Sequence, residues 1–420
     1  MLDVAVIADD LTGAADCGIA FAAAGLSTFV AFGDAPAPPS AHVVAIDIDS
    51  RRQAEGEAAE RARSSAARAY RDGARILYKK IDSTLRGHVG PEIAATLRVA
   101  AEARRGRTLA ILAPAFPATG RTTRDGLVLV KGVPLERTEV WRDARMTGPA
   151  EPVAMLRRAG LSAAAVPLAT VRGGADALSQ ELDRLASGGA DAVVCDAESE
   201  EDLRAIAAAG ARLARPVVWA GSAGLARHLP VALGLRPDGT RAPPPSPSTG
   251  GAVLVLVGSR SSVAREQARV LSEEPGVARI VLEPGALLGG ERGPGWPAAA
   301  LERALASGSD VLAVIGEEPA GVERGPDLAA AAARLVAPYA AYLGGIVATG
   351  GDIARAILGA LGATGVHLHG EVEPGVPLGI TDSAPALPVV TKAGAFGSPA
   401  TLARCRAALR QLGSGSARAG

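Results

Sequence analysis

Residues 76–87 read Ile-Leu-Tyr-Lys-Lys-Ile-Asp-Ser-Thr-Leu-Arg-Gly, and this stretch holds two of the four lysines in the chain. An apolar run at residues 76–78 passes directly into charged and turn-forming residues. The pattern predicts a β-strand that ends at the carboxyl edge of an α/β sheet, where ligands usually bind. Because nearly all other cations of the chain are arginines, we interpret Lys79 and Lys80 as residues placed for a specific role.

Apolar runs of strand length alternate with longer Ala-, Arg- and Glu-rich segments on both sides of this stretch. That alternation is typical of βα units building a mostly parallel sheet flanked by helices. A first helix is predicted from about Ala14 to Gly25. Strands are predicted near residues 4–8, 43–48, 76–81, 109–114, 163–167 and 192–195, and then near 252–257, 279–282, 311–315, 346–349 and 389–391.

The chain length predicts two α/β domains, because 420 residues exceed the single-core size of about 250 to 300 residues. Residues 243–251, Pro-Pro-Pro-Ser-Pro-Ser-Thr-Gly-Gly, are too rich in proline for the interior of an element and predict a linker. We therefore expect domains at residues 1–242 and 252–412. The small polar residues 413–420 predict a disordered tail.

The composition favours small-molecule partners. Lys+Arg and Asp+Glu each total 44, and no basic block suggests a nucleic-acid surface. Charged, glycine or proline residues interrupt every apolar run before it reaches membrane-spanning length, so we expect a cytoplasmic protein without membrane contact. The 3 cysteines are scattered and predict neither a disulfide framework nor a cysteine-based metal site.

The first predicted strand ends in Asp9-Asp10-Leu11-Thr12-Gly13. Because successive strand residues point to opposite faces, one of the two carboxylates is expected to meet a ligand and the other to be structural. A carboxylate at this edge can accept hydrogen bonds from sugar hydroxyls, while Thr12 and the backbone N–H groups that follow suit an anion. The alternative is that Asp10 or Thr12 only caps the helix.

In the stretch quoted first, the period of two places Lys80 and Asp82 on one face, with Arg86 in the following turn. This mixture suits a polyhydroxylated carboxylic acid. Lys80 or Arg86 would pair with its carboxylate, and Asp82 would hold or deprotonate a hydroxyl. The alternative is a surface Lys-Asp pair in a loop, which contributes little stability.

Three predicted strands of the second half end in glycine-containing turns, at residues 258–262, 349–352 and 392–397. Glycines let a phosphate approach backbone N–H groups, and a following helix adds its positive end. Neither Gly-x4-Gly-Lys-Ser/Thr nor Gly-x-Gly-x-x-Gly occurs, so a P-loop and the standard dinucleotide motif are excluded. Nucleotide binding, if present, requires another arrangement.

Together these segments resemble the four-carbon acid sugar kinase family. The motifs that carry the resemblance are IADDLTGAADCG (7–18), YKKIDSTLRGHVGPEI (78–93), PAFPATGR (114–121), DGLVLVKGVPLERTE (125–139), ATGGDIARAIL (348–358), EVEPGVPLG (371–379) and TKAGAFGS (391–398). The resemblance implies an ATP-dependent kinase that phosphorylates the terminal hydroxyl of threonate, erythronate or 3-oxo-tetronate. It also implies that the N-terminal domain binds the acid sugar and the C-terminal domain binds the nucleotide.

The resemblance assigns residues to both substrates. On the acid-sugar side they are Asp9, Asp10, Lys80, Asp82 and Arg86, with Asp82 as the candidate base and Asp10 as its competitor. On the ATP side they are Ser259 or Ser261, Gly350, Gly351, Asp352, Ile353 and Gly394, with Asp352 as a candidate ligand of Mg²⁺. Arg260 and Ile353 depart from residues common in the family.

The form of KKIDSTLRG is more similar to threonate and erythronate kinases than to the 3-oxo-tetronate branch, so D-threonate or D-erythronate is the expected substrate. A 3-oxo-tetronate 4-kinase and a non-catalytic sugar-acid binding or regulatory protein are the alternatives. A nicotinamide-dependent dehydrogenase is disfavoured by the missing Gly-x-Gly-x-x-Gly motif. The oligomeric state stays open, with a homodimer as one option.

Overall fold

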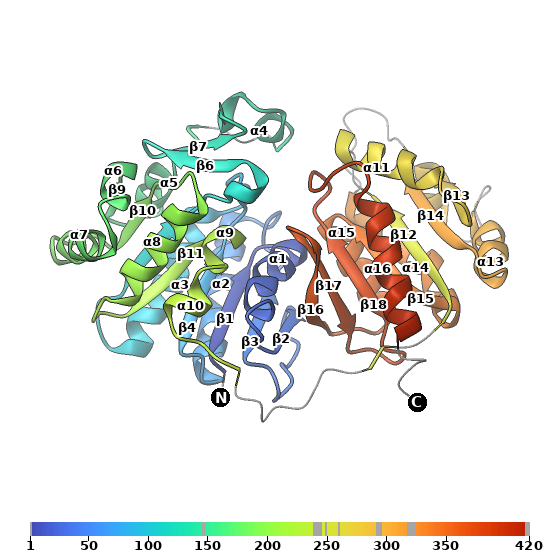
Figure 1. Ribbon diagram of the computed structural model, residues 1–420, viewed down its shortest axis with the longest axis horizontal. Coiled ribbons are helices and arrows are strands. Elements are labelled where there is room, and N and C mark those ends of the chain that lie inside the picture. Colours follow the sequence, from blue (N-terminus) through green and yellow to red (C-terminus); the bar gives the residue numbers. More distant parts are fainter. Residues whose placement is uncertain are drawn as a thin grey trace. The chain divides into compact units, whose positions relative to one another are not determined.

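The computed structural model describes residues 2–144, 146, 148–237, 246–247, 250–258, 261–290, 296–316 and 325–415. The chain divides into two compact units, Met1–Arg241 and Ala242–Gly420, each with a sheet flanked by helices (Figure 1). Most of the predicted linker, at 243–245 and 248–249, lies outside the described residues.

The sheet of the first unit is parallel at every strand pair. Its strands are, in spatial order, β2 (Thr28–Phe32), β3 (Val43–Asp47), β1 (Val4–Ala8), β4 (Ile76–Lys80), β11 (Val217–Gly221), β5 (Leu109–Ala113), β10 (Ala192–Cys195) and β9 (Ala163–Val166). The runs read from the sequence became β1, β3, β4, β5, β9 and β10, whereas β2 and β11 were not predicted. Both are five residues long, as are the predicted strands β1, β3, β4 and β5, so their length does not account for the omission.

Helices cover both faces of this sheet. Apolar side chains of α2 (Glu55–Arg71), α3 (Val89–Arg104) and α5 (Pro152–Arg158) enter the two buried clusters on one face. The remaining helices of the unit are α1 (Leu11–Ala22), α4 (Glu139–Asp143), α6 (Leu168–Val171), α7 (Ala175–Ser187), α8 (Glu200–Ala211), α9 (Ala223–Ala226) and α10 (Leu229–Ala232). The prediction that the first helix starts near Ala14 was wrong by a turn, because Asp10 caps it and it begins at Leu11.

A small antiparallel sheet in the first unit was not predicted. It consists of β6 (Arg121–Arg124), β7 (Leu127–Val130) and β8 (Val133–Pro134), and two 3₁₀ turns flank it, η1 (Pro117–Thr119) and η2 (Leu135–Arg137). Its strands alternate buried and exposed residues over only a few positions, which is too short a pattern to detect in the sequence.

The second unit has a mixed sheet. Its strands are, in spatial order, β13 (Val277–Leu282), β14 (Asp310–Ile315), β12 (Ala252–Val257), β15 (Leu343–Thr349), β18 (Pro388–Lys392), β17 (Val376–Thr381) and β16 (Gly365–Glu373). Pairing is parallel from β13 to β18 and antiparallel from β18 to β16. Both units are therefore α/β with mostly parallel sheets, as the sequence predicts.

Helices of the second unit pack on this sheet. α11 (Ser262–Ser272) and α16 (Thr401–Gly415) bury their apolar residues against one face. The others are α12 (Pro284–Gly289), α13 (Ala298–Ala306), α14 (Gly325–Val336) and α15 (Gly351–Ala360), with the 3₁₀ turn η3 (Ala337–Tyr342). α16 continues beyond Leu412, into the segment predicted as a tail, and residues 416–420 lie outside the described part.

Candidate active site

Three loops leave the carboxyl edge of the first sheet next to one another. β1 lies between β3 and β4 with parallel register, so that Ala8 pairs with Asp47 on one side and with Lys80 on the other. The segments that follow these strands carry Asp9 and Asp10, then Arg51, and then Asp82. Because the strands end at the same level, these side chains converge.

Arg51 joins the three acidic residues. Its Nε lies 2.6 Å from Oδ2 of Asp9, its Nη1 lies 2.7 Å from Oδ2 of Asp10, and its Nη2 lies 3.7 Å from Oδ1 of Asp82. The side chain of Arg51 is 19% exposed, so these ion pairs are shielded from bulk water. A guanidinium presents several donors in a fixed plane, which lets one side chain fix three carboxylates. Sequence reasoning missed Arg51.

Asp82 is held from a second side by Arg86. The Arg86 guanidinium donates to both carboxylate oxygens, from Nε to Oδ2 at 2.8 Å and from Nη2 to Oδ1 at 2.8 Å. The Thr84 hydroxyl and the Thr84 N–H also donate to Oδ2. Burial alone would raise the pKa of Asp82, but the charges of Arg86 and Arg51 outweigh it and hold this pKa well below its ordinary value. Asp82 is therefore a firmly ionised hydrogen-bond acceptor.

Asp10 serves the helix and the charged cluster at once. Its Oδ1 accepts from the Gly13 N–H at 2.8 Å as the N-cap of α1, and its Oδ2 accepts from the Thr12 hydroxyl at 2.8 Å. Burial works against ionisation, yet Arg51 and Lys80 lower the pKa of Asp10 overall. The alternative that Asp10 caps the helix is thus correct, since Asp10 accepts from the Gly13 N–H. Asp10 is also ion-paired with Arg51, so capping is not its only contact. Asp9 differs, because its buried Oδ1 has no hydrogen-bond partner in the described structure.

The two adjacent lysines point in different directions. Lys80 is 4% exposed, and its ammonium donates to the Ile81 carbonyl at 2.8 Å close to the start of α1. Lys79 is fully buried on the other side of the strand, and its Nζ lies 2.6 Å from Oε2 of Glu92. The alternative of a surface Lys-Asp pair is therefore wrong, since Lys80 and Asp82 are both buried.

The Lys79–Glu92 pair supports the loop that carries Arg51. Glu92 accepts a second hydrogen bond at Oε1 from the Ser50 hydroxyl at 2.7 Å. The backbone N–H of Ser50 donates to the Asp9 carbonyl at 3.0 Å. A buried ionic network thus fixes the backbone one residue before Arg51, which indicates a positioning role for Lys79 rather than substrate contact.

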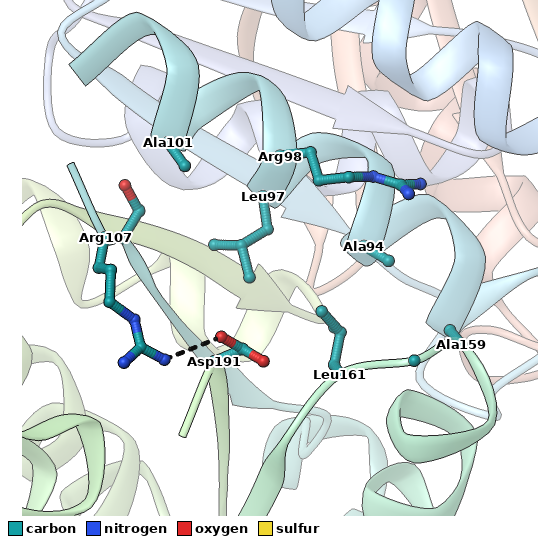
Figure 2. Close-up of a pocket in the computed structure, with 10 residues that line it drawn as sticks. Ala94, Leu97, Arg98, Ala101, Arg107, Ala159, Leu161 and Asp191 are labelled. Atoms are coloured by element: carbon teal, nitrogen blue, oxygen red, sulfur yellow. Dashed lines mark hydrogen bonds and ion pairs between the residues drawn. The ribbon is translucent and has the colours of Figure 1, made fainter. Parts of the chain in front are cut away.

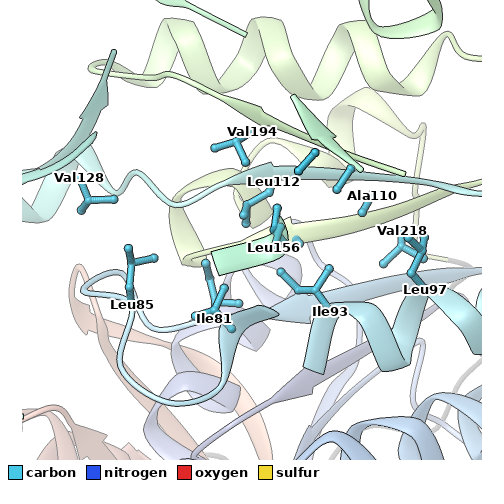
Figure 3. Close-up of a cluster of buried hydrophobic side chains, with 14 of the residues drawn as sticks. Ile81, Leu85, Ile93, Leu97, Ala110, Leu112, Val128, Leu156, Val194 and Val218 are labelled. Atoms are coloured by element: carbon cyan, nitrogen blue, oxygen red, sulfur yellow. The ribbon is translucent and has the colours of Figure 1, made fainter. Parts of the chain in front are cut away.

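Apolar anchors hold the 81–86 loop in place. Ile81 and Leu85 are 2% and 0% exposed and enter the cluster that includes Ile93 and Leu112 (Figure 3). Because these two side chains are fixed in the core, the residues between and after them, including Asp82, are held at the sheet edge. The two apolar residues of this otherwise polar stretch therefore anchor it to the core.

Arg121 is a further cation near this cluster. It opens β6, is 9% exposed, and donates from Nη1 to the Thr119 carbonyl at 2.5 Å. Burial lowers the pKa of Arg121, and the charges of Asp82, Arg86 and Asp16 also act on it. It ends the motif PAFPATGR, a sequence signal to which no role had been assigned.

In the second unit, β12, β15 and β18 are neighbours with parallel pairing. Their carboxyl ends therefore bring the three glycine-containing turns to one edge. Gly350 has a φ of +95°, and no atom lies within 4 Å of the position its Cβ would take, so the turn is open at this point. α15 begins at Gly351 after the N-cap residue Gly350, which has no side chain to cap it, and the positive end of the helix favours an anion. Ser259 lies outside the described residues.

Polar side chains fix the turn that contains Gly394. The Ser261 hydroxyl donates to the Gly394 carbonyl at 2.8 Å and also caps α11. Gln267 donates from Nε2 to the carbonyls of Phe396 and Ser398 at 3.0 and 2.9 Å. Ser261 therefore shapes the turn.

Ile353 and Asp352 differ in their surroundings. Ile353 is 5% exposed and fills the space over Gly258, where a Cβ would lie 2.4 Å from its Cγ1. Asp352 is half-buried in the first turn of α15. Within the described ranges, no group of three or more His, Cys, Asp or Glu residues could hold a metal ion.

One surface pocket lies elsewhere in the first unit. Its volume is about 290 Å³, and α3, the segment before β5 and the loop before β9 line it, with Leu97 and Leu161 facing Arg107 and Asp191 (Figure 2). Thr108 and Asp191 precede β5 and β10, so the pocket opens at the amino edge of the sheet. It is thus remote from the charged cluster at the carboxyl edge. No helix in the described part of the chain is long and apolar enough to cross a membrane.

Comparison with known proteins identifies both units. The chain matches a sugar-binding N-terminal domain at residues 4–229 and a nucleotide-binding C-terminal domain at residues 254–402. A D-threonate kinase from Cupriavidus necator is 47% identical, over 94% of this chain and 95% of that protein. A D-erythronate kinase from Heliobacterium modesticaldum is 32% identical, over 96% of each.

A crystal structure shares the fold. A protein from Salmonella typhimurium, described as a putative tRNA synthase, has a TM-score of 0.78 at 21% identity, covering 96% of this chain and 98% of that one. Fold and matches together define a two-domain α/β protein with a sugar-binding and a nucleotide-binding half. The chain belongs to the four-carbon acid sugar kinase family, as its motifs predict. It is a phosphotransferase of the class that acts on an alcohol group.

Proposed function

We propose that this protein transfers the terminal phosphoryl group of ATP to the 4-hydroxyl of a four-carbon sugar acid in the cytoplasm, with D-threonate as the preferred substrate. The charged cluster of Asp9, Asp10 and Asp82 with Arg51, Lys80 and Arg86 supports this proposal most directly. The 47% identity to a D-threonate kinase favours D-threonate over D-erythronate and 3-oxo-tetronate.

The first unit would bind the acid through complementary groups. The cations Lys80 and Arg86 pair with the substrate carboxylate, and Arg51 holds the facing carboxylates in position. Oδ1 of Asp9, which has no hydrogen-bond partner among the described residues, accepts a hydrogen bond from a substrate hydroxyl. Asp82 orients the terminal hydroxyl, because a carboxylate with a strongly lowered pKa is a weak base. Phosphoryl transfer through a loose transition state requires little early proton removal.

The second unit would bind the nucleotide. Gly350, Gly351 and Gly394 let phosphates approach the backbone, and Ser261 and Ile353 border the same edge; Ser259 remains the alternative to Ser261 that the family resemblance offers. We assign Mg²⁺ to Asp352, since magnesium in kinases usually binds one or two carboxylates together with substrate phosphates. One half-buried carboxylate at a helix start fits that donor set. The ion supplies neutralisation of phosphate charge during transfer.

A coupled ADP-release assay tests the proposal. D- and L-threonate, D- and L-erythronate and 3-oxo-tetronate are each offered with ATP and Mg²⁺. Release of ADP is expected with D-threonate at the highest kcat/KM. If kcat/KM is highest with 3-oxo-tetronate, the protein is a 3-oxo-tetronate 4-kinase instead. Binding of an acid without any ADP release would instead favour a non-catalytic sugar-acid binding protein.

Replacing Lys80 by alanine is expected to raise the KM for the acid and leave the KM for ATP unchanged. Loss of one charge-assisted hydrogen bond costs about 1.5 to 3 kcal/mol, which corresponds to roughly 10- to 150-fold. Steady-state kinetics with both substrates varied measures the effect. Lys131→Asn removes an exposed lysine between β7 and β8 and serves as the control. If only the KM for ATP rises, Lys80 contacts the phosphates of ATP instead of the acid.

A further inference from the structure

Lys392, at the carboxyl end of β18, is a buried cation that forms no ion pair with an acidic side chain in the described part of the chain. Its side chain is 1% exposed. Within the described chain, the ammonium makes one contact, a hydrogen bond of 3.3 Å to the Gly394 carbonyl. Buried ammonium groups are normally paired, because an uncompensated charge in the interior is costly. The position therefore lacks an anion.

A second unsatisfied polar group lies beside Lys392. Thr349 ends β15 and is the parallel register partner of Lys392, so their side chains project from the same face of the sheet. Thr349 is 0% exposed, and its Oγ1 has no hydrogen-bond partner among the described residues. A buried hydroxyl without a partner loses the hydrogen bonds that it had with water. The Lys392 ammonium and the Thr349 hydroxyl can therefore both donate hydrogen bonds to one bound acceptor.

The backbone next to these side chains is open. Gly350 follows Thr349, and its N–H donates to the Lys392 carbonyl at 2.9 Å. The left-handed φ of Gly350 turns the chain into α15, and no atom occupies the space where a side chain would stand. The N-terminal end of α15 adds a partial positive charge at the same edge. A ligand that satisfies an ammonium, a hydroxyl and a helix N-terminus together is an anion.

We propose that Lys392 and Thr349 bind a phosphate group of the nucleotide, with the ammonium as the main charged contact. This inference rests on the proposed nucleotide role of the second unit. It adds residues that neither the sequence motifs nor the comparisons assign. Before binding, the hydrogen bond to Gly394 holds the ammonium in the turn, which places it ready for the phosphate.

The electrostatics agree with this geometry. Burial lowers the pKa of Lys392 to about 8, and the nearby Cys405 and Glu373 counteract this only in part. Glu373, on β16, is engaged by Arg404 at 2.6 Å and by the Thr401 hydroxyl. Burial raises the pKa of the Cys405 thiol to about 12, so this thiol is neutral at pH 8. A bound phosphate would favour the ammonium, raise its pKa and make binding take up a proton near pH 8.

Titration calorimetry of the full chain with ADP tests the inference. At pH 8, in buffers of different ionisation enthalpy, the wild-type protein is expected to take up a fraction of a proton as ADP binds. Lys392→Met keeps the apolar stem and removes the charge, so it should lose this uptake and bind ADP roughly 10- to 100-fold more weakly at pH 7. Thr349→Val should show a smaller loss of ADP affinity.

Adenosine separates phosphate contact from turn structure. It lacks phosphates, so Lys392→Met should bind it like the wild type. Equal losses for adenosine and ADP, or wild-type ADP affinity in Lys392→Met, would overturn the inference. If that variant does not fold, absence of proton uptake in the wild type decides against it. A wild-type protein that binds no ADP would contradict the proposed function itself, whereas normal ADP binding with unchanged variants would contradict only the role of Lys392 and Thr349.

Discussion

Asp82→Asn is expected to lower kcat by about 10²- to 10⁴-fold, with the acid still bound. The amide keeps the shape of the side chain but removes the charge that Arg51 and Arg86 share. Without that charge, the two guanidinium groups lose their common partner, and the terminal hydroxyl loses the acceptor that orients it. Steady-state kcat and KM for the acid, with calorimetric binding of the acid, separate turnover from affinity.

Two variants complete this experiment. Asp10→Asn preserves the cap of α1, because asparagine is as good an N-cap as aspartate, and therefore tests only the charge of Asp10. Asp191→Asn changes an ion-paired aspartate at the opposite edge of the sheet and should leave kcat unchanged. If Asp82→Asn turns over near-normally and Asp10→Asn is inactive, Asp10, at the end of β1, is the carboxylate that assists transfer.

Lys79→Met is expected to reduce the free energy of unfolding of the first unit by about 3 to 5 kcal/mol. Lys79 and Glu92 are 0% and 2% exposed, so the variant leaves a buried carboxylate without its cation. Urea unfolding followed by tryptophan fluorescence measures the change, with Trp141 and Trp219 both buried in this unit. Turnover should also fall, since Glu92 positions Ser50 next to Arg51.

A double variant distinguishes charge imbalance from lost packing. Lys79→Met with Glu92→Gln removes both charges and keeps an acceptor for the Ser50 hydroxyl, so it should recover most of the lost stability. Arg63→Met breaks an exposed pair on α2 and should leave the unfolding midpoint unchanged. If the double variant is as unstable as Lys79→Met, packing of the lysine stem is the larger contribution.

Local patterns in the sequence predicted the central strands and the chemistry at their ends. β1, β4 and β12 were predicted with accurate starts, because β1 and β12 are apolar throughout and β4 begins with the apolar residues 76–78 before its two lysines. Each of these strand ends was read separately as a ligand-binding edge, and the family resemblance grouped Asp9 and Asp10 with Asp82; the parallel pairing of β1 with β4 gives the physical reason. The strands β2 and β11 were missed although they are as long as β1 and β4, so strand length does not separate the predicted strands from the missed ones.

The sequence by itself determined the class of fold, the two-part organisation and the types of charge at the edge of the first sheet, because these depend on hydrophobic period and local turn chemistry. Apart from the local pair of Arg86 with Asp82, only the tertiary structure decided which partners those charges have. Arg51 reaches three carboxylates from two other segments, and Lys79 turns toward Glu92 on α3 while Lys80 faces the cluster. Such contacts join residues far apart in the chain, and no local pattern encodes them. The packing of the folded chain determines these ion pairs, because a charge is tolerated in the interior only where a residue of opposite charge lies beside it.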